Sequence, residues 1–276
     1  MISGPGLGLR RDLADCLLEH SGDIPAFVEL APENWMGIGG FWKKKLKAVS
    51  ERYPLTTHGL SLSIGSPEPL DWEFLKRLKN FFSEYPVAVY SEHLSYSKCD
   101  NAHLYDLLPI PFRADAVKHV ASRIREVQDF LERKIAIENV SYYTSVAPEM
   151  DEASFVKAVV EESNCLLLLD INNVYVNSFN HSYDPKQFIS KLPLDKVAYI
   201  HMAGHEQVAP DLIIDTHGQS IIDPVFDLFS WTIPKIKPVP VLLERDFNIP
   251  AFPELLQELS ELNHRMQSAW RLSNAA

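Results

Sequence analysis

Seven short apolar runs in the sequence each lead into one or two side chains that can bind a metal ion. The runs occupy residues 55–58, 87–93, 135–138, 166–170, 197–201, 212–217 and 241–244. Runs of this length suit strands, and continuous apolar strands are typical of a parallel sheet covered by helices on both faces. Residues 27–30 form one more such run, so we expect eight strands.

Segments with helical spacing of apolar residues separate these runs. In residues 113–132 a single stripe forms from Val117, Val120, Ala121, Ile124, Val127 and Leu131. We expect further helices at 40–53, 71–83, 152–161, 224–231 and 253–266. Strand and helix thus alternate about every 35 residues, which predicts an α/β fold of the (β/α)8 TIM-barrel type. An open doubly wound sheet is the alternative.

Composition and charge favour one globular domain spanning residues 1–276. No Pro/Gly/Ser-rich linker divides the chain, and its formal charge of −11 opposes nonspecific binding to nucleic acid or to anionic membranes. The N-terminal segment has no apolar core of the signal-peptide kind, and no apolar run approaches the roughly 18 residues that cross a bilayer. We therefore expect a cytoplasmic protein with neither nucleic acid nor membrane as a partner.

The polar groups at the ends of the runs are the candidate metal ligands. In a TIM barrel the carboxyl ends of all strands meet at one mouth, so ligands distant in sequence share a pocket. Asp215 and His217 are two residues apart and would share one side of an extended segment. The full candidate set is His58, His93, Glu138, Asp170, His201, Asp215, His217 and Glu244.

Each candidate taken singly has an ordinary structural explanation. A lone histidine is more often a hydrogen-bonded residue than a ligand, and a carboxylate at a strand end often caps the next helix. Several carboxylates unpaired in one mouth, however, would cost several kcal/mol each unless cations neutralised them. Arg245 is the one Lys or Arg next to a candidate ligand, so a metal cluster is the favoured interpretation.

The ligand types restrict the metal. Cys16, Cys99 and Cys165 form no C-x-x-C pair, which indicates ligation by nitrogen and oxygen. Imidazole with carboxylate suits iron, manganese or zinc. One ligand set would be His58, His93 and Glu138. A second would be Asp170, His201 and Glu244, with Glu138 placed to bridge the two.

Other polar and glycine-rich segments are assigned lesser roles. We expect Glu92, His181 and His205 at the rim of the site or behind its ligands. The glycine-rich segments at 4–8 and 37–40 lack the spacing of a phosphate-binding loop, and we expect turns there.

Eight segments of the chain resemble a bacterial family long of unknown function, the multinuclear non-haem iron-dependent oxidative enzymes that include the methanobactin-type peptide-modifying oxidases. The segments occur in order and jointly are highly specific. They are ELAPENW (29–35), THGLSLS (57–63), SEHLS (91–95), IENVS (137–141), LDINNVYVN (169–177), YIHMAGH (199–205), DTHG (215–218) and LERD (243–246).

The resemblance implies a TIM barrel that holds two or three iron ions in mixed Fe(II)/Fe(III) states. It assigns His58, His93 and Glu138 to one iron and Asp170, His201 and Glu244 to another. Asp215 and His217 would hold the third with an asparagine, for which we favour Asn173 over Asn172. Glu138, Asp170 and Glu244 are the carboxylates expected to take part in catalysis.

By the same resemblance, the protein would use O2 to oxidise cysteine residues of a ribosomally made precursor peptide. A separate partner protein would bind the leader of that peptide. Two other functions stay open: a divalent-metal hydrolase or isomerase on the same barrel, and a non-catalytic partner-binding protein with a structural metal.

Overall fold

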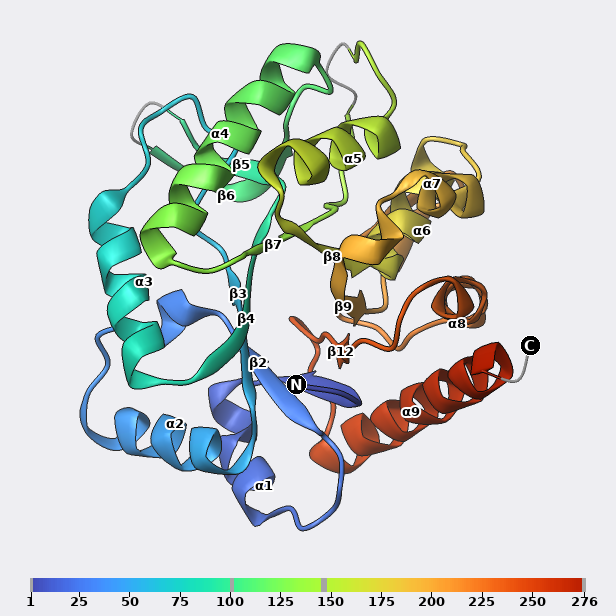
Figure 1. Cartoon of the computed structure of the whole chain (residues 1–276). Helices are drawn as coiled ribbons and strands as arrows, with labels where there is room; N and C mark the ends of the chain where they lie inside the picture. Colours follow the sequence, from blue (N-terminus) through green and yellow to red (C-terminus); the bar gives the residue numbers. More distant parts are fainter. Residues whose placement is uncertain (1, 100–101, 145–147, 275–276) are drawn as a thin grey trace.

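The computed structural model describes residues 2–99, 102–144 and 148–274. In this part of the chain, parallel strands close into a barrel in the order β1-β12-β9-β8-β7-β4-β3-β2 (Figure 1). The strands are β1 (Pro5–Gly8), β2 (Phe27–Leu30), β3 (Leu55–Gly59), β4 (Val87–His93), β7 (Ala136–Glu138), β8 (Leu166–Asp170), β9 (Val197–Met202) and β12 (Val241–Leu243). Because β1 pairs with both β12 and β2, the barrel is closed, and the prediction of a TIM barrel is confirmed.

Two assignments made from the sequence, a strand at 212–217 and a turn at 4–8, were wrong. The run at 212–217 supplies β11 (Leu212–Ile214), which pairs with β10 (Glu206–Ala209) in an antiparallel hairpin outside the barrel. The eighth barrel strand is instead β1, where we expected a turn. A Cβ atom on Gly6 would lie 2.2 Å from the ring of Phe27, so glycine leaves room for that buried ring. The strand therefore lacks the apolar run that marks the others.

Helices surround the barrel, and those expected from the sequence are all present. Helices α1, α6 and α7 were not expected; α6 is rich in Asn and β-branched residues, which favour helices weakly. The helices are α1 (Ala14–Glu19), α2 (Gly40–Arg52), α3 (Trp72–Glu84), α4 (Ala114–Leu131), α5 (Glu152–Ser163), α6 (Ile171–Asn180), α7 (Pro185–Lys191), α8 (Asp223–Thr232) and α9 (Phe252–Asn274).

Short elements complete the connections. A second hairpin, β5 (Ser95–Cys99) with β6 (Ala102–Pro109), follows β4, as the β10–β11 hairpin follows β9. Both hairpins therefore extend from the carboxyl ends of barrel strands. The 3-10 helices are η1 (Arg11–Leu13), η2 (Pro32–Asn34), η3 (Leu194–Lys196) and η4 (Ile233–Lys235).

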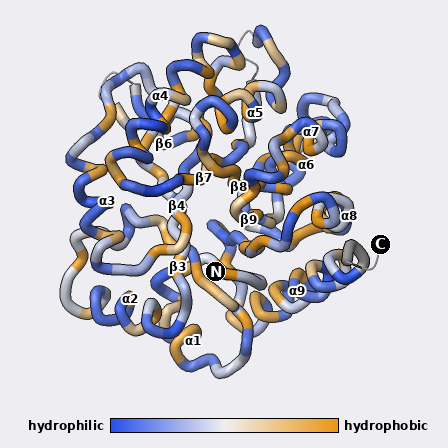
Figure 2. The backbone as a smooth tube through the Cα atoms, viewed as in Figure 1, coloured by the Kyte–Doolittle hydropathy of each residue, from blue (hydrophilic) through white to orange (hydrophobic). Residues whose placement is uncertain are grey.

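Apolar packing positions the polar end of the barrel. Hydrophobic residues concentrate on the strands, while helices such as α4 also carry hydrophilic residues (Figure 2). Inside the barrel, a separate buried cluster consists of Ala136, Leu168 and Tyr199. Each lies two residues before a candidate ligand and shares its side of the strand. The ligands thus rest on an apolar layer. No helix in the described ranges is long and apolar enough to cross a membrane.

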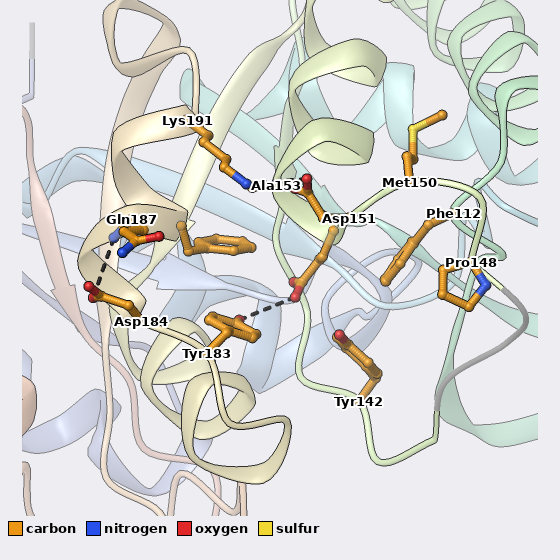
Figure 3. A pocket seen from close by; sticks show the side chains of 12 residues that line it. Phe112, Tyr142, Pro148, Met150, Asp151, Ala153, Tyr183, Asp184, Gln187 and Lys191 are labelled. Carbon is orange, nitrogen blue, oxygen red and sulfur yellow. Dashed lines mark hydrogen bonds and ion pairs between the residues drawn. The ribbon is translucent and has the colours of Figure 1, made fainter.

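A pocket of about 240 Å³ lies outside the barrel, at the N-termini of α5 and α7 (Figure 3). Its wall includes Tyr142, Tyr183 and the buried side chain of Glu152. Asn177 Nδ2 donates to Glu152 Oε1 at 3.2 Å, and the Tyr183 hydroxyl donates to Oε2 at 3.2 Å. Burial raises the pKa of Glu152 to about 8, so this carboxyl group joins α5, α6 and the 181–184 turn in its protonated form.

The Gly6 contact predicts an asymmetric effect of two alanine substitutions in β1. Gly6→Ala should lower the free energy of unfolding by about 1–3 kcal/mol, because the buried Phe27 ring must move. Gly8→Ala is the matched control, since a Cβ there meets nothing within 4 Å. Chemical denaturation of both variants, prepared with chelator, tests this. Equal stabilities would contradict the packing account.

Glu152 predicts a pH dependence of stability. The folded state holds the Glu152 proton up to about pH 8, whereas an unfolded glutamate loses it near pH 4.5. The folded state therefore binds more protons between these values, and this group lowers stability as pH rises through the window. Glu152→Gln should remove that loss, so its advantage over the wild type grows from pH 5 to pH 8. Thermal melts should show no such trend for the control Glu162→Gln on the exposed side of α5.

Candidate metal centre

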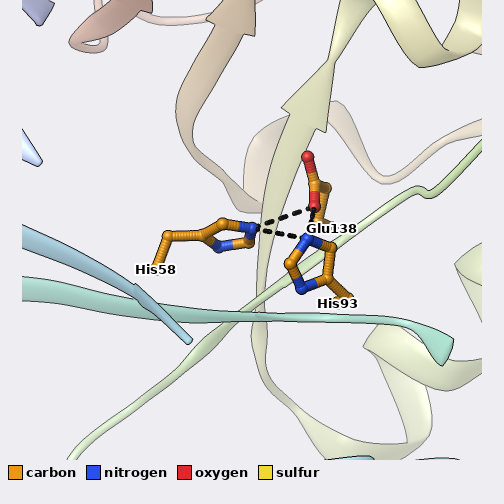
Figure 4. A group of neighbouring side chains, drawn as sticks. All are labelled: His58, His93 and Glu138. Atoms are coloured by element: carbon orange, nitrogen blue, oxygen red, sulfur yellow. Dashed lines mark hydrogen bonds and ion pairs between the residues drawn. The ribbon is translucent and has the colours of Figure 1, made fainter. Parts of the chain in front are cut away.

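His58, His93 and Glu138 meet at the ends of β3, β4 and β7. Glu138 Oε2 lies 3.1 Å from His58 Nε2 and 3.3 Å from His93 Nε2, and the two ring nitrogens are 3.0 Å apart (Figure 4). The strand register produces this meeting, because His93 lies opposite Glu138 and His58 opposite Ser91. The three side chains form the first group able to hold a metal ion.

Hydrogen bonds to the far ring nitrogens orient both histidines. His93 Nδ1 lies 3.0 Å from the Gly59 carbonyl oxygen, which only accepts, so Nδ1 carries the proton and Nε2 has a free lone pair. His58 Nδ1 contacts Ser91 Oγ at 2.7 Å. Two imidazole nitrogens thus face one carboxylate oxygen, an arrangement suited to a shared cation.

Without a metal ion, a proton on His58 balances the charge of the Glu138 carboxylate. Burial opposes a charge on His58, but the Glu138 carboxylate outweighs it and raises the pKa of His58 to about 9. Burial and the charge on His58 together lower the pKa of His93 to about 4. Metal binding therefore competes with a proton at His58.

Glu138, Asp170, His201 and Glu244 form a second group. His201 Nδ1 lies 2.9 Å from Glu244 Oε2 and 3.6 Å from Glu138 Oε1. Burial disfavours a charge on His201, yet the carboxylates of Glu244 and Glu29 raise its pKa well above the usual value. Glu138 belongs to both groups, and its role as a bridge between two metal ions stays a prediction.

The donor atoms of this second group are close together but not hydrogen-bonded. Asp170 Oδ2, Glu138 Oε2, Glu244 Oε2 and both ring nitrogens of His201 are buried without a partner in hydrogen-bond geometry. Arg245 does not neutralise them, because its guanidinium binds Glu258 Oε2 at 2.6 Å. Buried donor atoms that approach one another without bonding fit metal ions well.

The two carboxylate oxygens of Asp170 have different surroundings. Its Oδ1 accepts from the backbone N–H of Asn173 at 2.5 Å and caps α6, while Oδ2 is buried without a hydrogen bond. The capping alternative therefore applies to one oxygen and leaves the other for a metal. Burial and the neighbouring Glu138 raise the pKa of Asp170 well above its ordinary value.

His217, Glu244 and Asp246 form the third group. His217 Nδ1 lies 3.1 Å from Asp246 Oδ2 and 3.4 Å from Glu244 Oε2, and His217 Nε2 lies 2.7 Å from Asp215 Oδ1. The structure thus brings Asp215 and His217 together, but by a different geometry from the extended strand we expected. His217 has φ +49° and lies in a bend after β11, so the segment that holds it is not an extended strand.

The two asparagines of the Asp170 loop differ in their free atoms. Asn172 uses both ends of its amide, donating to Asp215 Oδ1 at 2.7 Å and meeting His205 Nδ1 at 2.8 Å. Asn173 donates to the Asn139 carbonyl, while its Oδ1 is buried without a partner. Asn173 therefore has an amide oxygen without a hydrogen bond, whereas Asn172 does not, and the choice of Asn173 as a ligand stays a prediction.

The residues expected around the ligands lie at different distances from them. His205 stacks on Tyr175 and hydrogen-bonds Asn172. Asn172 in turn donates to Asp215, so one residue separates His205 from Asp215. His181 stacks on Tyr142 and donates to its carbonyl oxygen, and it belongs to none of the three groups. Glu92 is buried and accepts from the Tyr90 hydroxyl at 2.5 Å; burial and the neighbouring Glu33 raise its pKa to about 8.

Two carboxylates beside the ligands were missed by sequence reasoning. Glu29 Oε1 lies 2.9 Å from His201 Nε2, and Asp246 belongs to the third group. The signal for Glu29 was a charged residue inside the apolar run at 27–30. Both line a pocket of about 300 Å³ that also includes Arg10, His58 and Glu244.

Comparisons with known proteins agree with this architecture. Residues 4–267 match the family model for the RiPP precursor modification enzyme MbnB/TglH/ChrH. A UPF0276 protein of Shewanella amazonensis is 49% identical over 274 residues, covering 98% of this chain and 97% of its own. A UPF0276 protein of Nitrosospira multiformis, Nmul_A2550, is 52% identical over 258 residues, covering 92% and 90%.

Solved structures show the same fold at low sequence identity. A xylose isomerase-like TIM-barrel protein from Mycobacterium smegmatis, in complex with magnesium, has a TM-score of 0.65 at 10% identity, covering 97% of both chains. Endonuclease IV from Thermus thermophilus has a TM-score of 0.61 at 13% identity, covering 97% of this chain and 99% of its own.

Fold and site together define a TIM-barrel protein with overlapping groups of potential metal ligands at the carboxyl ends of its strands. The chain belongs to the MbnB/TglH/ChrH family of enzymes that modify RiPP precursors, the ribosomally made peptides later converted to natural products. The resemblance found in the sequence is thereby confirmed.

The raised pKa of His58 predicts proton release on metal binding. At neutral pH, Zn²⁺ added to chelator-treated protein should displace a proton from His58, so its apparent affinity should rise with pH towards about 9. Calorimetric titration in buffers of different ionisation enthalpy measures the release. An observed heat that does not depend on the buffer would contradict it.

Proposed function

We propose that this protein is a multinuclear iron enzyme that uses O2 to oxidise a cysteine residue in a precursor peptide. The observation that carries the proposal is the sharing of ligands between groups. Glu138 belongs to the first and second groups, and Glu244 to the second and third. Shared carboxylates are suited to holding neighbouring metal ions in one centre.

The donor set supports iron. His58, His93 and Glu138 would hold one ion, and Asp170, His201 and Glu244 a second that shares Glu138. A third would use His217 with Asp215 and Asn173, and the structure adds Asp246 as a further candidate. Imidazole and carboxylate without thiolate suit non-haem iron. The described free cysteines, Cys16 and Cys165, are in none of these groups.

Bound iron would supply a Lewis acid for the substrate thiol and electrons for reaction with O2. The chain contributes burial and position. Glu138, Asp170 and His201 are at most 2% exposed, so bulk water is kept from them. The pocket beside Glu244 gives a substrate a route to the groups, and Arg10 stands at its edge, paired with Asp246.

A peptide substrate also fits the loops around the mouth. Exposed apolar side chains occur on segments that follow the barrel strands: Leu60, Tyr143, Val208 and Phe247. These side chains would be available to contact a peptide bound at the mouth. We include in the proposal a cysteine-containing precursor peptide and a separate partner protein that binds its leader.

Metal content of two variants tests the shared-ligand arrangement. Glu138→Ala should lose the iron of two sites, because the first and second groups share this carboxylate. His217→Ala should lose iron from the third site alone, and His181→Ala is the control outside the groups. Elemental analysis of anaerobically purified proteins measures the result. Equal losses in Glu138→Ala and His217→Ala would contradict the assignment.

Activity tests the chemistry itself. Protein reconstituted with ferrous iron should consume O2 when given cysteine-containing peptides encoded beside its gene, and mass spectrometry should locate the change at cysteine. The same peptides with cysteine replaced by serine are the control. Native protein that holds zinc alone, together with no O2 uptake after iron loading, would overturn the proposal.

A divalent-metal hydrolase or isomerase is the second candidate. The same nitrogen and oxygen donors suit zinc or manganese, and this is the observation that favours it. Turnover of the peptide by zinc- or manganese-loaded protein without O2 would support this candidate over the oxidase.

A further inference from the structure

Three buried polar side chains, Glu29, Tyr199 and Ser91, lie in a series between His201 and His58. Glu29 Oε1 is 2.9 Å from His201 Nε2, although off the line of a straight hydrogen bond. The Tyr199 hydroxyl bonds Ser91 Oγ and interacts electrostatically with the nearby Glu29 carboxylate. Ser91 Oγ lies 2.7 Å from His58 Nδ1. One side chain therefore follows another from the second ligand group to the first.

The barrel register places these residues. Glu29 lies opposite Thr56 on β3, and the Thr56 hydroxyl donates to Glu29 Oε2 at 3.0 Å. Ser91 lies opposite His58. Tyr199 precedes His201 by two residues and so faces the same side of β9. All are buried, and none of Glu29, Tyr199 and Ser91 belongs to a metal-ligand group.

Glu29 and Ser91, the first and last of these three residues, face different nitrogen atoms of the two histidine rings. Glu29 faces His201 Nε2, which leaves Nδ1 towards Glu244 and Glu138. Ser91 faces His58 Nδ1, which leaves Nε2 towards Glu138. A carboxylate next to one imidazole nitrogen fixes the proton there and the lone pair on the other nitrogen.

We propose that Glu29, Tyr199 and Ser91 are positioning residues that select the ligating nitrogen of His201 and of His58 and couple the two ligand groups. This inference rests on the proposed metal centre. Loss of any link should therefore affect both groups, including the one that the altered residue does not touch.

Two substitutions that keep the shape of the side chain test the positioning role of these residues. Tyr199→Phe removes one hydroxyl, and Glu29→Gln removes one charge. The matched controls are Tyr183→Phe and Glu152→Gln, because Tyr183 and Glu152 are a hydrogen-bonded pair outside the centre. Thr56→Val is a second route to loosening Glu29 without altering charge. Circular dichroism of each protein checks that it folds.

The readouts are metal affinity and the Mössbauer spectrum of the protein loaded with ⁵⁷Fe(II). In Tyr199→Phe and Glu29→Gln, affinity should fall about tenfold or more, as for other residues that orient metal ligands. The quadrupole splitting of both iron components should change. The controls should keep the wild-type affinity and spectrum. A merely structural Tyr199 would lower stability and leave the spectrum unchanged.

The outcome separates this inference from the proposed function. If Tyr199→Phe, Glu29→Gln and Thr56→Val all retain wild-type affinity and spectra, the positioning chain is wrong while the iron centre stands. If the wild type binds no iron, the proposed function fails. The same variants are then compared for Zn²⁺ affinity by chelator competition. An unchanged affinity would contradict the positioning role of Glu29, Tyr199 and Ser91 as well.

Discussion

The contact of Glu138 with three histidines is the interaction on which the site depends. Its Oε2 lies 3.1 Å from His58 and 3.3 Å from His93, and its Oε1 lies 3.6 Å from His201. These histidines come from three other strands, so the contact requires a closed barrel with its strands in register. The carboxylate is 2% exposed, and it needs positive charge close by.

Protons and metal ions are alternative sources of that charge. Proximity to carboxylates raises the pKa values of His58 and His201 against the effect of burial, while burial and Glu138 raise that of Asp170. Several carboxylate oxygens and histidine nitrogens of the centre therefore lie close together without forming hydrogen bonds. The apolar layer of Ala136, Leu168 and Tyr199 beneath it keeps water out, which strengthens the demand for cations.

The sequence predicted the barrel because its strands are apolar on both faces, a pattern that covering helices impose. It failed at β1, where Gly6 makes room for the Phe27 ring and removes the apolar signal. Residues 212–214 are equally apolar but form a hairpin, since pairing partners are not encoded in local hydropathy. The helix α6 was missed because its Asn and β-branched residues favour helices weakly, although the Asp170 side chain caps its start.

The candidate ligands were predictable where a strand ends in His, Asp or Glu. The contacts of Glu29 and Asp246 were not, because both depend on how neighbouring strands and loops approach. Likewise, the sequence marked the pair of Asn172 and Asn173, whereas only the hydrogen bonds of the folded chain show which amide oxygen is free.

The central claim is that several iron ions lie together at the carboxyl ends of the strands. Anomalous diffraction at the iron absorption edge, from crystals of anaerobically purified protein, tests it most directly. The account predicts separate iron peaks beside His58, His93 and Glu138 and beside Asp170, His201 and Glu244. A single peak, or peaks that appear only at the zinc edge, would contradict it.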